Sequence, residues 1–166
     1  MDKQEIYAFL KEKNLDFEIT EHPAVYSMEE LAQVALPYPE ADAKNLFVRD
    51  DKKRNYYLIT VKGDKRVDLK EFQKKHGTRR LSFASADDLM AIMGLIPGAV
   101  TPLGVLNDEE GKVQVVFDEV LRDWPAVGVH PNDNTATLRV PLSDLLALFQ
   151  DRAVPYRFVD MDVAPA

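Results

Sequence analysis

The segment Gly94–Gly104 holds three glycines and two prolines in eleven residues and almost no charge. Such a composition breaks helices and strands, so it predicts a structured loop. Helical and strand patterns alternate before this loop, whereas short strand patterns follow one another after it. The order predicts an α+β fold with a mixed, mostly antiparallel sheet or partial barrel, and it argues against a doubly wound parallel sheet.

The hydrophobic periodicity and the turn signals predict the individual elements. The expected helices cover 3–13, 27–36, 69–75, 86–93 and 142–149. The expected strands cover 17–20, 44–49, 56–62, 105–107, 113–118, 127–130, 135–140 and 156–159. Ser27 with Glu30 forms a capping-box pattern, and Ser85 is a good N-cap residue.

The chain of 166 residues, 46% of them hydrophobic, is long enough for one domain spanning residues 1–166. We find no apolar run of the roughly 18 residues that a membrane span needs and no secretion signal, which predicts a cytoplasmic protein without a membrane partner. Cysteine is absent, which excludes disulfides, thiolate metal ligands and cysteine nucleophiles.

The charge is unevenly distributed. The net charge is -7, yet residues 44–80 contain 13 of the 21 Lys and Arg and only 5 of the 28 Asp and Glu. This basic segment therefore carries +8 while the rest of the chain carries -15. Such clustering fits a phosphate-binding surface, although an ordinary solvated face gives the same pattern.

The sequence lacks the motifs of common enzyme classes, namely the GxSxG elbow, the P-loop, GxGxxG and HExxH. The three histidines, His22, His76 and His130, do not have metal-ligand spacing, so we expect no metal site. Ser82 and Ser85 precede a predicted helix, where a hydroxyl is more often a cap than a nucleophile.

Three segments could carry chemistry. Lys44 shares its strand parity with Leu46 and Val48, so it points inward if they do, either towards an anion or snorkelling to the surface. The loop Gly98–Pro102 could present main-chain N–H groups to a polar substrate or simply be a tight connection. The turn 129–137 is rich in hydrogen-bonding side chains and could be a site or an Asx turn.

These segments resemble a known family. The motifs occur in the order found in prolyl-tRNA editing proteins of the YbaK and prolyl-tRNA-synthetase insertion-domain superfamily, over about residues 5–160. They are Lys44-Asn45-Leu46-Phe47, Leu81-Ser82-Phe83-Ala84-Ser85, the loop from Pro97 to Gly104, and the turn from Val129 to Thr137. The form of the loop resembles most the branch that hydrolyses alanine mischarged on proline tRNA.

The resemblance implies an α+β fold with a barrel-like mixed sheet, a single pocket and neither metal nor nucleotide cofactor. It implies catalytic roles for Lys44, Gly98 and His130. Substrate-binding residues are implied in the same motifs, at Asn45, Ala99, Val100, Thr101, Pro102 and Thr135. The implied partner is aminoacylated proline tRNA, and the charge pattern leads us to expect that the basic segment 44–80 holds it. Prolyl-tRNA synthetase or an elongation factor is a further candidate partner, and whether a synthetase delivers the substrate stays open.

Two alternatives to an alanine-specific deacylase stay open. One is deacylation of another mischarged tRNA, such as cysteine on proline tRNA. The other is a non-catalytic tRNA-binding or regulatory module that keeps the same fold.

Overall fold

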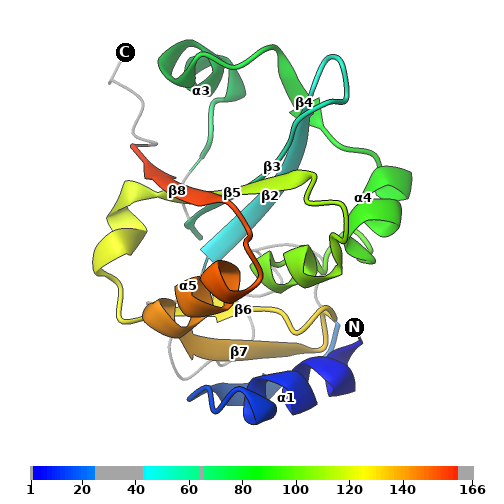
Figure 1. Ribbon diagram of the computed structural model, residues 1–166, viewed down its shortest axis with the longest axis vertical. Helices are drawn as coiled ribbons and strands as arrows, with labels where there is room; N and C mark the ends of the chain where they lie inside the picture. Colours follow the sequence, from blue (N-terminus) through cyan, green and yellow to red (C-terminus); the bar gives the residue numbers. More distant parts are fainter. Residues whose placement is uncertain (1, 25–42, 64–65, 161–166) are drawn as a thin grey trace.

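The computed structural model describes residues 2–24, 43–63 and 66–160, which form two β-sheets with helices between and around them (Figure 1). The helices are α1 (Lys3–Glu12), α3 (Leu69–His76), α4 (Ala86–Met93) and α5 (Leu142–Asp151), with the 3₁₀ helices η2 (Pro102–Asn107) and η3 (Glu119–Asp123). The strands are β1 (Glu18–Glu21), β2 (Ala43–Asp50), β3 (Tyr56–Lys62), β4 (Leu81–Phe83), β5 (Val113–Asp118), β6 (Ala126–Val129), β7 (Ala136–Pro141) and β8 (Tyr156–Val159). No helix within the described ranges is long and apolar enough to cross a membrane.

The larger sheet has the strand order β4-β2-β3-β5-β8. Its centre is the hairpin of β2 and β3, in which Lys44 lies opposite Val61. The buried carboxylate of Asp50 holds the hairpin turn, since it accepts hydrogen bonds from the Arg54 backbone N–H at 2.9 Å and the Asn55 side chain at 2.8 Å. β4 pairs antiparallel with β2, whereas β5 and β8 extend the sheet in parallel.

The smaller sheet, β1-β7-β6, is antiparallel and is joined to the larger one through the main core. Helix α5 contacts β6 and β7, and the ring of its Phe149 lies 6.2 Å from that of Phe117 on β5. Figure 1 shows α5 between the two sheets and α1 beside the smaller one. A second core cluster lies on the other face of the larger sheet, where Phe72 of α3 packs with Val48 and Leu81.

The structure confirms the α+β class and most of the predicted elements. The predicted hairpin is present, and α4 begins where expected because the Ser85 hydroxyl accepts a hydrogen bond from the Asp88 backbone N–H at 3.0 Å. The sheets are barrel-like in arrangement but do not close into a barrel. The helix predicted from Ser27 and the loop 37–39 lie outside the described residues.

The strand predicted at 105–107 is wrong, because Pro102–Asn107 forms the 3₁₀ helix η2. Thr101 caps this helix by accepting a hydrogen bond from the Leu103 backbone N–H at 3.3 Å, and proline suits its first turn. A short apolar run fits a strand or a buried helical turn equally well, so periodicity did not separate them. The sequence analysis also missed β4 and η3, both of which are very short.

Close packing of η2 against the main core gives a stability prediction. A Cβ atom at Gly104 would lie 2.5 Å from Leu95 Cδ1 and 2.7 Å from Met93 Cε, and both side chains are buried. We expect Gly104→Ala to lower the free energy of unfolding by about 1–3 kcal/mol, because the core must shift to accept the methyl group. Urea denaturation measures this, and an unchanged midpoint would mean that the core beside η2 yields without cost.

Candidate active site

Lys44 is half-buried near the start of β2. Alternation along the strand places it on the same face as Leu46 and Val48. Val48 belongs to the second core cluster, on the side of the sheet that α3 covers, and Leu46 packs against that cluster. Its ammonium group makes no hydrogen bond or ion pair within the described part of the chain. Because withdrawing an unpaired ammonium from water costs free energy, this position suits an anionic ligand.

Asn45 points to the opposite face of β2 and connects three segments. Its Oδ1 accepts a hydrogen bond from the hydroxyl of the buried Thr60 at 2.7 Å, and its Nδ2 donates to the Val100 carbonyl at 3.4 Å. A carbonyl can only accept, so this contact fixes which end of the amide faces the loop. The second N–H of the amide has no acceptor among the described residues and remains available to a ligand.

The loop Gly98–Pro102 is ordered by its own contacts. Gly98 has φ of 92°, which disfavours residues with a Cβ. Ala99, Thr101 and Pro102 are buried, while Gly98 and Val100 are half-buried. The Ala99 N–H donates to the Ile96 carbonyl at 3.1 Å, whereas the amides of Gly98 and Val100 have no acceptor in the described ranges. These two amides could bind a substrate oxygen.

The structure therefore brings Asn45, and not Lys44, into contact with the predicted loop. Lys44 lies on the other face of the same strand, one residue away. A ligand at the start of β2 could meet Lys44 on one side and the Asn45 amide on the other.

His130 and Thr135 lie at the turn between β6 and β7. The Nδ1–H of His130 donates to the Ala136 carbonyl at 3.0 Å, which leaves Nε2 as an acceptor without a partner in the described structure. Burial lowers the pKa of His130, and the ring of His22, 6.5 Å away, lowers it further. The hydrogen bond to Ala136 opposes this shift, and the net lowering of the pKa favours the neutral imidazole. Thr135 is already engaged, since its hydroxyl donates to Asp133 and accepts from Lys3.

Sequence reasoning missed a network around this turn. Lys3 bonds to Glu21, and the Tyr7 hydroxyl donates to the same carboxylate at 3.0 Å. The Lys3 hydrogen bond lowers the pKa of Glu21, while burial and the Glu21 carboxylate raise that of Tyr7. The network fixes α1 to β1 and the β6–β7 turn, and no sequence motif marks it because its members are far apart in the chain.

Sequence reasoning also did not predict that His22 lies next to His130. The Nδ1 of His22 lies 2.9 Å from the Pro23 carbonyl and its Nε2 lies 2.9 Å from the Thr137 hydroxyl.

No group of three or more His, Asp and Glu side chains that could hold a metal ion occurs within the described residues.

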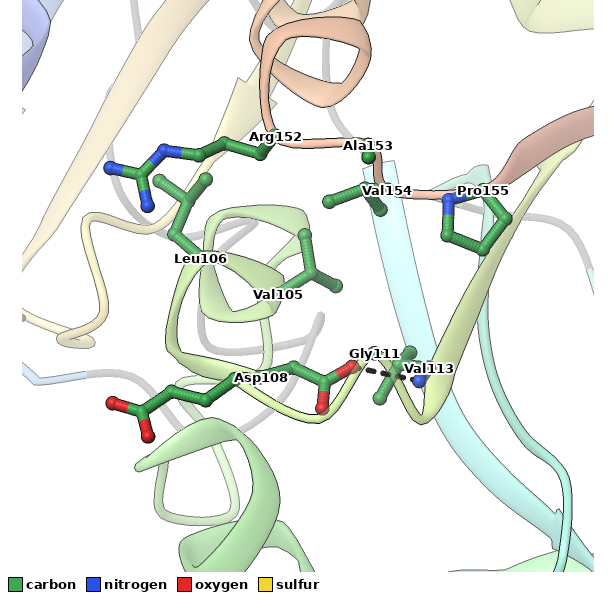
Figure 2. A pocket seen from close by; sticks show the side chains of 10 residues that line it. Val105, Leu106, Asp108, Gly111, Val113, Arg152, Ala153, Val154 and Pro155 are labelled. Atoms are coloured by element: carbon green, nitrogen blue, oxygen red, sulfur yellow. Dashed lines mark hydrogen bonds between the residues drawn. The ribbon is translucent and has the colours of Figure 1, made fainter.

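A pocket of about 230 Å³ lies between the turn after η2 and the turn after α5 (Figure 2). Its lining shares no residue with the predicted site. Asp108 in this pocket accepts a hydrogen bond from the Val113 backbone N–H at 2.8 Å, and Arg152 lies over the Phe9 ring at 5.1 Å. These charged groups therefore already serve the packing of the fold.

Comparisons with known proteins agree with this arrangement. Residues 22–148 match the model of the aminoacyl-tRNA editing domain. The chain is 40% identical over 159 residues to the prolyl-tRNA editing protein ProX of Acetoanaerobium sticklandii, covering 96% of this chain and 97% of that protein. It is 31% identical to the prolyl-tRNA synthetase associated domain-containing protein 1 of Danio rerio, covering 90% of this chain and 82% of that protein.

The fold has relatives among solved structures. A crystal structure of a candidate trans-editing enzyme for prolyl-tRNA synthetase superposes with a TM-score of 0.73 at 23% identity, covering 98% of this chain and 97% of that one. The family model covers most of the chain, and the curated relatives span nearly its whole length. The chain therefore belongs to the aminoacyl-tRNA editing domain family, whose members are hydrolases that deacylate aminoacyl-tRNA.

Proposed function

We propose that this protein hydrolyses the ester of alanine mischarged on proline tRNA, releasing alanine and free tRNA in trans. The relative named as a prolyl-tRNA editing protein supports proline tRNA as the tRNA of the substrate. The form of the Gly98–Pro102 loop supports alanine as its amino acid. The observation that carries the proposal is the half-buried Lys44, which has no ion partner among the described residues, beside an Asn45 amide held against that loop. Translation takes place in the cytoplasm, and we place the protein there.

The proposed chemistry needs no protein nucleophile. An aminoacyl ester is already activated, so hydrolysis requires orientation, stabilisation of developing negative charge and a placed water or ribose hydroxyl. In our proposal the ester lies at the start of β2. Lys44 holds an ester oxygen or the adjoining phosphate from one face of the strand. The amides of Gly98 and Val100 and the second N–H of Asn45, which have no acceptor among the described residues, approach the substrate from the other face.

His130 is proposed as a secondary site residue. Its Nε2 can accept a hydrogen bond from substrate or water because Nδ1–H is held by the Ala136 carbonyl. Thr135 would act through the turn rather than by direct contact, since its hydroxyl is bonded to Asp133 and Lys3.

Specificity is proposed to come from the size of the pocket at the loop. Gly98 has no side chain, and Ala99 and Val100 are compact, so the backbone can approach a small aminoacyl group closely. A synthetase cannot reject an amino acid smaller than its own by binding energy alone, because a lost methylene is worth only about 1–3 kcal/mol. Editing by a second, smaller pocket supplies the missing discrimination.

The basic segment 44–80 is proposed to bind tRNA phosphates. Its exposed cations include Lys52, Lys53, Arg54, Lys74, Lys75, Arg79 and Arg80. Arg79 is paired with Asp51, Lys74 with Glu71 and Lys75 with Asp160, all in exposed ion pairs that a phosphate can replace at little cost. Prolyl-tRNA synthetase or an elongation factor could deliver the substrate.

A panel of esters tests the proposed substrate. We expect alanyl-tRNA(Pro) to be hydrolysed at least about tenfold faster than prolyl-tRNA(Pro), because the small pocket proposed at the loop would exclude the larger ring. Single-turnover release of each amino acid is the measurement, with cysteinyl-tRNA(Pro) as the test of the related activity. Equal hydrolysis of the alanyl and prolyl esters would contradict editing, and no hydrolysis of any ester would favour a non-catalytic module.

The role of Lys44 is tested by substitution. We expect Lys44→Ala to fold but to lose about a hundredfold or more in deacylation, about 3 kcal/mol, because an ammonium group that stabilises developing charge is lost. Lys44→Arg should restore part of the rate at best, since it keeps the charge but changes the reach.

The matched control is Lys112→Ala, which removes an exposed lysine paired with Glu110 outside the basic segment. It should deacylate like the wild type. Circular dichroism establishes that each variant is folded. Wild-type turnover by folded Lys44→Ala protein would remove Lys44 from the mechanism.

A further inference from the structure

Phe83 has the most exposed large apolar side chain among the described residues, with 62% of its surface accessible to solvent. It ends β4, the edge strand of the larger sheet. A single exposed phenyl ring is not unusual by itself. Its position relative to Lys44 and to the neighbouring cations makes it informative.

Strand register places Phe83 and Lys44 on the same face of the sheet. Phe83 lies opposite Val48 of β2, and directly opposed residues of antiparallel strands point to the same side. Lys44 precedes Val48 by four residues and shares that face. At about 3.4 Å per residue, Lys44 lies roughly 14 Å along the strand from the position of Phe83.

The charged groups near Phe83 on this face include four cations, of which Lys74 and Arg79 are paired with the exposed carboxylates of Glu71 and Asp51. Helix α3 covers the face through Phe72 and is tied to β4, since its Gln73 side chain accepts a hydrogen bond from the Leu81 backbone N–H at 2.6 Å. Lys70 and Lys74 are exposed on α3, and Arg79 and Arg80 immediately precede β4. Arg80 is exposed and has no ion partner in the described ranges.

The nearest acidic groups in sequence belong to a different face. Asp87 and Asp88 lie in the first turn of α4. That helix packs Leu89 and Met93 into the main core on the opposite side of the sheet, and the Tyr56 hydroxyl donates to Asp88 there. An exposed ring among cations suits a polyanion that also offers flat apolar surfaces, which is the chemistry of unpaired nucleotides.

We propose that Phe83 stacks on an unpaired base of the tRNA 3′ end while Lys44 holds the esterified terminal adenosine. The proposal rests on the deacylase function proposed above. The separation of roughly 14 Å exceeds one stacked step of about 3.4 Å, so the base on Phe83 is one that precedes the terminal adenosine. The 3′ end then runs along the edge of β2 from the ring to the lysine.

The experiment measures binding of uncharged tRNA(Pro) with its unpaired 3′ end and of the same tRNA trimmed back to its last base pair. We expect Phe83→Leu, which keeps an apolar side chain but removes the ring, to weaken binding of intact tRNA roughly tenfold. It should leave binding of trimmed tRNA unchanged. Phe83→Tyr, which keeps a stacking ring, should bind intact tRNA like the wild type.

Two further variants separate the possible causes. Met90→Ala removes another exposed apolar side chain, 52% accessible, on α4 and should change neither affinity. Arg80→Glu should weaken binding of both tRNAs and flatten the dependence on salt, because it acts through phosphates. Unchanged intact-tRNA binding by Phe83→Leu, or an equal loss with both tRNAs, would overturn the stacking role.

Deacylation by the wild-type protein is measured in parallel. If the wild type hydrolyses no ester, the proposed function fails, whatever Phe83 does. If the wild type is active and Phe83→Leu matches it in both binding and single-turnover rate, only the stacking role fails.

Discussion

The hydrogen bonds of the Asn45 side chain hold the candidate site together. Asn45 accepts from the buried Thr60 hydroxyl of the neighbouring strand and donates to the Val100 carbonyl of the glycine- and proline-containing loop. A buried hydroxyl left without a partner costs free energy, so the first contact stabilises the register of the hairpin. The second fixes the loop against the hairpin, and the position of Lys44 then follows from its place beside Asn45 on β2.

Electrostatics of the candidate site differ from those of the whole chain. The protein is acidic overall, with a net charge of -7, yet the half-buried Lys44 at the start of β2 has no anionic partner in the described part of the chain, and a basic segment follows it. This arrangement is costly for an isolated fold and favourable once a phosphate or an ester oxygen is bound. It suits a reaction whose substrate is already activated and whose transition state gains negative charge.

Local signals made the hairpin and α4 predictable, as the alternation in β2 and the Ser85 cap show. The alternation of side chains along β2 also predicted correctly that Lys44 lies on the same face of the strand as Leu46 and Val48. However, β2 is covered on both faces, so parity alone could not show that the Gly98–Pro102 loop meets Asn45, a contact between residues 55 positions apart. The proximity of His22 to His130 likewise depends on the pairing of β1 with β7, which no local pattern reveals.

The most direct measurement of the central claim is the NMR signal of the Lys44 ammonium group during titration with a non-hydrolysable amide analogue of alanyl-tRNA. The account predicts that this signal shifts and becomes protected from exchange as the analogue binds, because the ammonium then donates hydrogen bonds to its oxygens. The same signal should not change with tRNA that lacks the terminal adenosine. An unchanged Lys44 signal under saturation with the analogue would contradict the account.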